Sequence, residues 1–181
     1  MASQWPQTPW SPFTLCGPQI SSPDYIVGFI GFGRIAQATL TRLAAFGVTR
    51  CLFTTSSPKV PSQEYPGLQE KLDLTEFRNV SLDEIAQESD LVIVLAPGGA
   101  STYHLINDAF LKRMKMTAVL VNTARGTIVD SDALARALRE GWIWGAGIDV
   151  MEGEPNINAN HVLVKEPRSV TISSLPFLKN P

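Results

Sequence analysis

A glycine-rich turn between an apolar run and an amphipathic segment constrains the fold of this 181-residue chain more than any other feature. The run 25–30 (YIVGFI) is apolar throughout and contains no Pro or Asp, as is typical of a strand buried on both faces of a parallel sheet. The segment 34–46 then carries apolar residues at roughly helical spacing. The sequence therefore predicts a strand, a tight turn and a helix.

The turn, residues 31–36 (GFGRIA), matches the dinucleotide-binding fingerprint with Ala in the third glycine position. Gly31 permits the tight turn, and Gly33 lacks the Cβ that would keep a pyrophosphate away from the backbone. The helix that follows presents free N–H groups and the positive end of its dipole to the phosphates. A plain strand-to-helix turn is the alternative, but a second apolar run at 51–53 lies where the ribose-reading strand belongs. The candidate cofactor-binding residues of this turn are Gly31, Gly33, Arg34 and Ile35.

The end of a predicted strand at 50–54 indicates which dinucleotide binds. In NAD-binding domains an Asp or Glu about 20 residues past the glycines binds the ribose hydroxyls, and that carboxylate repels a 2′-phosphate. The sequence here offers hydroxyls followed by Lys59, and no acid. This favours NADP over NAD, although the stretch could also be only a polar turn. The candidate residues are Thr54, Thr55, Ser56 and Lys59.

Predicted strands and helices alternate along the rest of the chain. Residues 58–79 are polar and predict an exposed excursion with one helical turn, and Ser81 with Glu84 forms a capping box for a helix to about Glu88. Further strands are predicted at 91–96, 118–122, 146–150 and 170–173, and helices at 107–114 and 131–140, the second capped by Asp130 or Ser131. This order predicts an α/β fold, a doubly wound parallel sheet of the Rossmann type, as a single domain over 25–181.

Residues 1–24 differ from the rest. Five prolines exclude a regular helix of any length, while Trp5, Trp10 and Phe13 are too apolar for a disordered tail. We expect this arm to lie on its own domain or on a second subunit, and the sequence does not choose between them.

Composition excludes several classes of protein. The net charge of −2 without a basic block argues against a nucleic-acid partner. Two cysteines and two histidines without C-x-x-C spacing predict no metal site and reduced thiols. No apolar run approaches the ~20 residues that span a bilayer, and the N-terminus lacks the layout of a signal peptide. We therefore expect a soluble, cytoplasmic protein with no membrane partner.

Three predicted strands end in residues suited to ligand chemistry at one edge of the sheet. These residues are the glycine turn, Arg125 and Glu154, and open α/β sheets bind ligands at this carboxyl edge. Ala96 and Pro97, at the end of the predicted strand 91–96, are further candidate cofactor-binding residues. A guanidinium beside a nicotinamide suits a 2-oxo acid, because it binds the carboxylate and carbonyl oxygens and stabilises the developing alkoxide. A carboxylate would orient an imidazole acid. Alternatively, Arg125 forms a structural ion pair with Asp149 or Glu154.

The run from Val27 to Pro155 resembles the cofactor domain of the D-2-hydroxyacid dehydrogenases, and glyoxylate/hydroxypyruvate reductases most closely. The matching segments are VGFIGFGRIAQATLTRLAAFGV, SDLVIVLAPGGASTYHLIND and VLVNTARGTIVDSDALARALREGWIWGAGIDVMEGEP. The resemblance implies hydride transfer between NADPH and a small 2-oxo acid, with Arg125 binding the substrate and Glu154 as partner of the catalytic histidine. It also implies that Thr123, Ala124 and Asp149 lie against the nicotinamide, and that cofactor domains pair as homodimers.

The chain departs from this family in two respects. The turn that carries the family's catalytic histidine corresponds to residues 173–177 (SSLPF), and neither His104 nor His161 is a good substitute. The segments that build the family's substrate domain are also largely missing, as in an excised fragment or a truncated product. We therefore expect the chain to bind NADPH but to turn over negligibly on its own. The alternative is a non-catalytic NADP-binding or dimerisation module.

Overall fold

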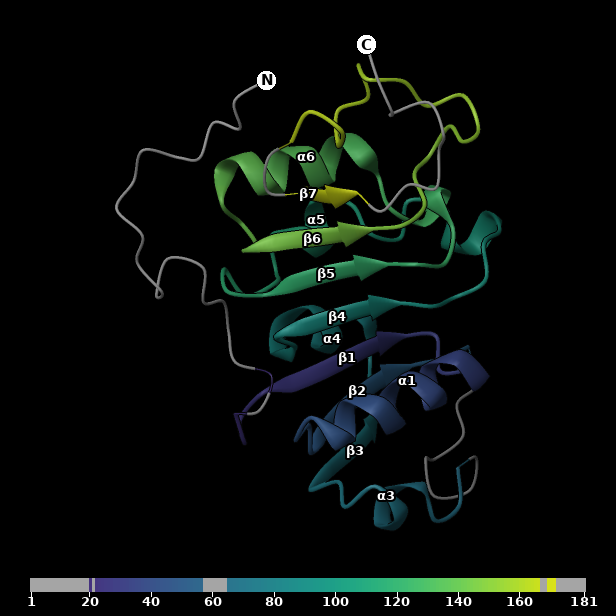
Figure 1. Ribbon diagram of the computed structural model, residues 1–181, viewed down its shortest axis with the longest axis vertical. Helices are drawn as coiled ribbons and strands as arrows, with labels where there is room; N and C mark the ends of the chain where they lie inside the picture. The colour runs from purple at the N-terminus through teal and green to yellow at the C-terminus, as the bar shows by residue number, and fades with distance from the viewer. Residues whose placement is uncertain (1–19, 21, 57–64, 167–168, 172–181) are drawn as a thin grey trace, which may run out of the picture.

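The computed structural model describes residues 20, 22–56, 65–166 and 169–171. In this part of the chain, parallel strands form a single seven-stranded sheet in the order β3-β2-β1-β4-β5-β6-β7 (Figure 1). The strands are β1 Ile26–Ile30, β2 Arg50–Thr54, β3 Glu76–Asn79, β4 Leu91–Val94, β5 Val119–Asn122, β6 Gly145–Ile148 and β7 Ser169–Thr171. The helices are α1 Arg34–Ala45, α3 Leu68–Lys71, α4 Leu82–Glu88, α5 Asp108–Leu111 and α6 Ser131–Glu140, with short 3₁₀ turns η2 Ala100–Thr102 and η3 Gly126–Ile128.

The strand order confirms the predicted doubly wound α/β fold. From β1 the chain builds outward through β2 to β3, then returns to the other side of β1 and builds outward from β4 to β7. The order reverses between β1 and β4, so connections leave these two neighbours in opposite directions. A crevice at the carboxyl ends of β1 and β4 is the expected ligand site of such a sheet.

Both faces of the sheet are covered. Successive residues of the central strands alternate between two buried clusters: Val27 and Phe29 pack with α1, while Ile26 and Ile30 pack with α4, α5 and α6. In Figure 1, α1 lies in front of β1 and β2, with α4 on the opposite face. Double-sided burial explains why β1 is apolar at every position.

Helix ends follow the local sequence signals. The capping box forms as predicted, since Ser81 Oγ accepts from the Glu84 N–H at 3.2 Å and the Glu84 carboxylate accepts from the Ser81 N–H at 3.0 Å. Of the two candidates for the cap of α6, Asp130 accepts from the N–H groups of Asp132 and Ala133. Gly141 ends α6 in the left-handed conformation, with φ of 73°, as is typical of a glycine after a helix.

The prediction of an exposed excursion over residues 58–79 is wrong at its C-terminal end. The expected helical turn is α3, but residues 76–79 form the edge strand β3, which pairs with β2 in the register Cys51↔Phe77. Phe77 is the one buried residue of β3, and charged side chains flank it. A strand with one buried side chain has no alternation to detect. Elsewhere the elements lie where predicted, although α5 and most strands are shorter.

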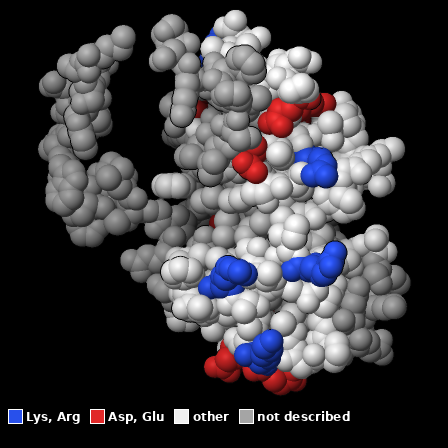
Figure 2. Space-filling model, turned by 45° about the vertical axis from the view of Figure 1, so that its right-hand side comes forward, with Lys and Arg blue, Asp and Glu red and all other residues white. Residues whose placement is uncertain are grey.

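The predicted N-terminal arm, the length of the helices and the surface charge complete the description. Residues 1–19 and 21 of the predicted N-terminal arm lie outside the described residues. Within the described part, none of the helices is long and apolar enough to cross a bilayer. On the face in Figure 2, basic side chains lie singly, separated by uncharged surface.

A carboxylate between two arginines joins β3 to the sheet. Glu76 accepts from Arg50 at 2.8 Å and from Arg78 at 2.6 Å. Burial alone would raise the pKa of Glu76, but the hydrogen bonds from Arg78 and Arg50 outweigh it and hold this pKa below its usual value. The charged form of Glu76 therefore stabilises the folded protein.

We expect Glu76→Gln to lower the free energy of unfolding by about 1–2 kcal/mol at neutral pH. Because the folded-state pKa lies below the unfolded value of about 4.3, this contribution is present above that value and is lost as the pH falls through the folded pKa. Urea unfolding of the variant and the parent, at neutral pH and near pH 3, measures it. An equal difference at both pH values would contradict the assignment.

Candidate functional site

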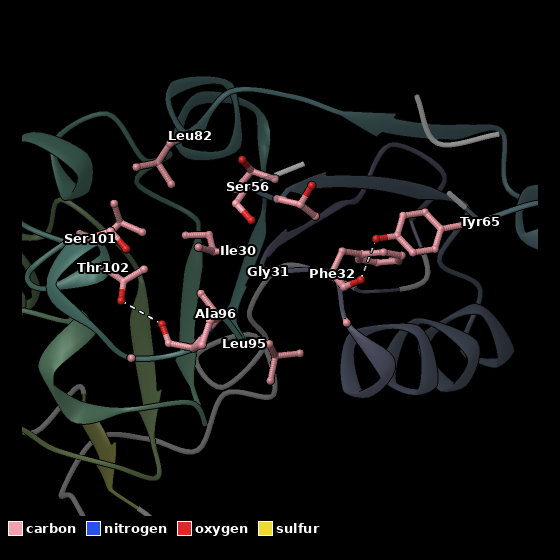
Figure 3. Close-up of a pocket in the computed structure, with 16 residues that line it drawn as sticks. Ile30, Gly31, Phe32, Ser56, Tyr65, Leu82, Leu95, Ala96, Ser101 and Thr102 are labelled. Atoms are coloured by element: carbon pink, nitrogen blue, oxygen red, sulfur yellow. Dashed lines mark hydrogen bonds between the residues drawn. The ribbon is translucent and has the colours of Figure 1, made fainter. Parts of the chain in front are cut away.

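The crevice at the switch point is a cleft of about 640 Å³. Its walls come from residues 30–33 at the end of β1, 54–56 at the end of β2 and 95–98 after β4. Figure 3 shows Phe32 and Tyr65 at one side, and Ser101 and Thr102 at the other. This volume lies within the range of small-molecule and cofactor sites.

The two glycines of the turn have different reasons to be glycine. Gly31 has φ of +88°, and a Cβ there would lie 2.7 Å from the backbone of Ala96. Gly33 has an ordinary φ of −85°, and a Cβ there would meet no protein atom within 4 Å. The fold thus requires Gly31, whereas Gly33 leaves open space at which a ligand can approach the backbone. This is the cradle that a pyrophosphate needs.

The N-terminus of α1 opens onto the same region. Gly33 caps the helix without a side-chain hydrogen bond, and the first turn has no acidic residue. Arg34 and Ile35 are exposed and, with Leu95, line a hollow of about 190 Å³. The first N–H groups of a twelve-residue helix and its positive dipole end are therefore available to an anion.

The end of β2 forms the third wall of the cleft. Thr54, Thr55 and Ser56 line it, and the Thr54 carbonyl accepts from the Gly31 N–H at 2.9 Å. None of the described residues along the cleft is acidic. Lys59, the predicted cation of this site, lies outside the described residues.

Arg125 lies next to the loop that follows β4. A Cβ on Gly98, which lines the cleft, would be 2.9 Å from Arg125 Cγ. The guanidinium donates to the Ala124 carbonyl at 2.7 Å. Among the described residues Arg125 forms an ion pair with neither Asp149 nor Glu154, so the alternative of a structural ion pair is not observed.

A buried asparagine, which sequence reasoning did not assign a role, shapes the Arg125 loop. Asn122 is fully buried, donates to the Arg125 carbonyl and accepts from the Ala124 N–H, both at 3.1 Å. The Asn122 carbonyl accepts from the Asp149 N–H at 3.0 Å. These bonds bring the turn that contains Thr123 and Ala124 beside Asp149. A polar residue ending an otherwise apolar strand was the available signal.

The loop after β6 packs tightly on the same turn. A Cβ on Gly126 would lie 2.1 Å from the backbone of Met151, so the two loops are in backbone contact. The Glu154 carboxylate accepts from the Met151 N–H at 3.0 Å within its own loop. Among the described residues no histidine pairs with Glu154, and the stretch 173–177, which lies outside them, contains none, so the role of Glu154 as the partner of a histidine stays a prediction.

Glu152, which sequence reasoning missed, is the carboxylate nearest to an imidazole in the described residues. Glu152 lies 2.8 Å from His104 Nε2 and accepts from the Tyr103 hydroxyl at 3.1 Å, a hydrogen bond that raises the pKa of Tyr103. Asp130 lies 3.7 Å from His104 Nδ1. The backbone N–H of His104 donates to the Thr127 carbonyl. His104 thus links the loops after β4, β5 and β6.

Comparison with known proteins decides the family. Residues 2–174 match the model described as "D-isomer specific 2-hydroxyacid dehydrogenase, NAD binding domain". The chain belongs to this family. Glyoxylate reductase from Thermofilum pendens is 39% identical over 167 residues, which are 90% of this chain and 44% of that protein. Glyoxylate reductase from Thermococcus onnurineus is 44% identical over 146 residues, 81% of this chain and 40% of that protein.

Solved structures agree with this family. The TT0316 protein from Thermus thermophilus has a TM-score of 0.74 at 35% identity, covering 91% of this chain and 47% of that one. An NAD-dependent formate dehydrogenase from Staphylococcus aureus in complex with NAD has a TM-score of 0.71 at 33% identity, covering 84% and 42%. The chain therefore spans less than half the length of these relatives, and the shared part is a NAD-binding domain of an oxidoreductase family.

The two glycines allow a matched pair of substitutions. We expect Gly33→Ala to leave the melting temperature within a few degrees of the parent, yet to weaken NAD(P)H binding at least about tenfold, because the added methyl occupies the phosphate cradle. Gly31→Ala should destabilise the fold by several kcal/mol, since it combines a left-handed φ with a backbone overlap. Thermal unfolding and titration of cofactor fluorescence measure both. Full affinity in Gly33→Ala would exclude this cradle.

Proposed function

We propose that this chain is the cofactor-binding part of a reductase that transfers a hydride from NADPH to a small 2-oxo acid of the glyoxylate or hydroxypyruvate type. The observation that carries the proposal is the cleft at the switch point, with its open Gly33 on one side and a β2 end without a carboxylate on the other. The glyoxylate reductases among its relatives support the substrate class.

The preference for NADPH rests on charge. A carboxylate at the end of β2 would bind ribose hydroxyls and repel a 2′-phosphate. Thr54, Thr55 and Ser56 leave the described cleft without such a charge, and Lys59 follows three residues later in the sequence. Hydroxyls followed in the sequence by a lysine suit a phosphate monoester.

The substrate end of the proposal rests on Arg125. Hydride addition to a carbonyl carbon puts negative charge on its oxygen, and a guanidinium can bind that oxygen and the neighbouring carboxylate together. The bound dinucleotide would supply the hydride. Arg125 borders the cleft at Gly98, and the Asn122 side chain holds its turn. Glu154, in the loop next to this turn, is the proposed carboxylate partner of an acid–base histidine.

A second candidate function is an NADP-binding module without turnover. The stretch 173–177, where the family resemblance expects the acid–base histidine, reads SSLPF and contains no imidazole.

We propose that the chain alone binds NADPH but reduces hydroxypyruvate negligibly, and that it pairs as a homodimer to which Trp5 and Trp10 contribute. Sustained turnover by the purified chain would overturn the first statement, and a monomer in sedimentation would overturn the second.

Calorimetric titration with NADPH and NADH tests the cofactor. We expect NADPH to bind at least about tenfold more tightly than NADH. Ser56→Asp places a carboxylate on the cleft wall, so it should weaken the binding of NADPH and strengthen the binding of NADH. Ser56→Asn, which has the size of Asp without its charge, should leave the preference for NADPH unchanged. A parent chain that prefers NADH would contradict the proposal, and binding of neither would remove the reductase function.

A further inference from the structure

A tyrosine outside the glycine motif contacts the glycine turn. The Tyr65 hydroxyl donates to the Phe32 carbonyl at 2.9 Å, across 33 positions of sequence. Figure 3 shows this bond at one end of the cleft, which Tyr65 and Phe32 both line. Tyr65 precedes α3 and belongs to none of the motifs that predict a cofactor site.

Packing fixes the position of the Tyr65 ring independently of its hydroxyl. The ring lies edge-on to Phe32 and Phe53, with centroids 5.0 and 5.5 Å away, and Phe77 is 6.1 Å away. Phe32 and Phe53 stack at 4.4 Å. Aromatic pairs in these arrangements are favourable beyond their buried area. The cluster therefore aims the hydroxyl at the turn.

The hydrogen bond sets the orientation of one peptide unit. The Phe32 carbonyl and the Gly33 N–H belong to the same planar trans peptide, so they point in opposite directions. With the carbonyl held by Tyr65, the Gly33 N–H points away from the aromatic cluster. Among the described residues no backbone carbonyl accepts from this N–H, and the space around Gly33 is open.

We propose that Tyr65 is a positioning residue for phosphate binding, which orients the Gly33 N–H toward the pyrophosphate of the dinucleotide. This inference rests on the proposed cofactor site. A turn whose peptide can rotate loses orientational freedom when the anion binds, whereas a tethered turn is already oriented. Because the pyrophosphate is common to NADPH and NADH, Tyr65 acts on both equally and does not select between them.

Tyr65→Phe removes the hydroxyl and keeps the ring. We expect the dissociation constants of NADPH and NADH to rise by the same factor, about three- to tenfold, with their ratio unchanged. In ¹⁵N-glycine-labelled protein without ligand, the Gly33 amide resonance should move. Tyr25→Phe, which removes a hydroxyl at the opposite end of β1, is the matched control and should change neither quantity.

Each outcome decides the inference. Unchanged dissociation constants, or weakening of NADPH alone, would overturn it, the second by assigning Tyr65 to the 2′-phosphate. If the parent chain binds neither dinucleotide, the reductase proposal fails, and ADP becomes the probe because it retains the pyrophosphate. A Gly33 resonance that ADP shifts in the parent but less in Tyr65→Phe supports the tether. No shift in the parent overturns the inference as well.

Discussion

The rest of the site depends on the close approach of Gly31 to the backbone of Ala96. The carboxyl ends of β1 and β4 come so near that a Cβ on Gly31 would lie 2.7 Å from Ala96. The chain therefore turns through a left-handed φ, donates to Thr54 at the end of β2 and enters α1 at Gly33. One steric constraint thus joins three strand ends and leaves the cleft between them.

Close backbone approach also organises the second half of the edge. Gly126 lies against Met151, which brings the loops after β5 and β6 together, and the buried Asn122 side chain holds the intervening turn. Arg125 consequently lies over Gly98, beside the cleft rather than in an ion pair with a neighbouring acid. The contact between His104 and Glu152 joins the loop after β4 to the loop after β6. The cleft and the Arg125 loop therefore lie along one connected edge of the sheet, its carboxyl edge.

The fold was predictable because its signals are local. Apolar runs long enough for a strand, Ser81 with Glu84, Asp130 and Gly141 each act on backbone within a few residues of themselves. The edge strand β3 escaped prediction because Phe77 alone is buried there, and its strand character comes from pairing with β2. A pattern of one residue carries no period.

The sequence by itself determined the glycine turn, the absence of an acid at 54–56, the family and, apart from the edge strand β3, the succession of strands and helices along the chain. Only the tertiary structure decided which groups meet: Tyr65 with Phe32 across 33 positions, Glu152 with His104 across 48, and Arg125 with Gly98. The physical reason is that capping and strand burial depend on neighbouring residues, whereas a side chain that crosses between loops depends on where the packed sheet brings those loops. Such contacts leave no periodic trace in the chain.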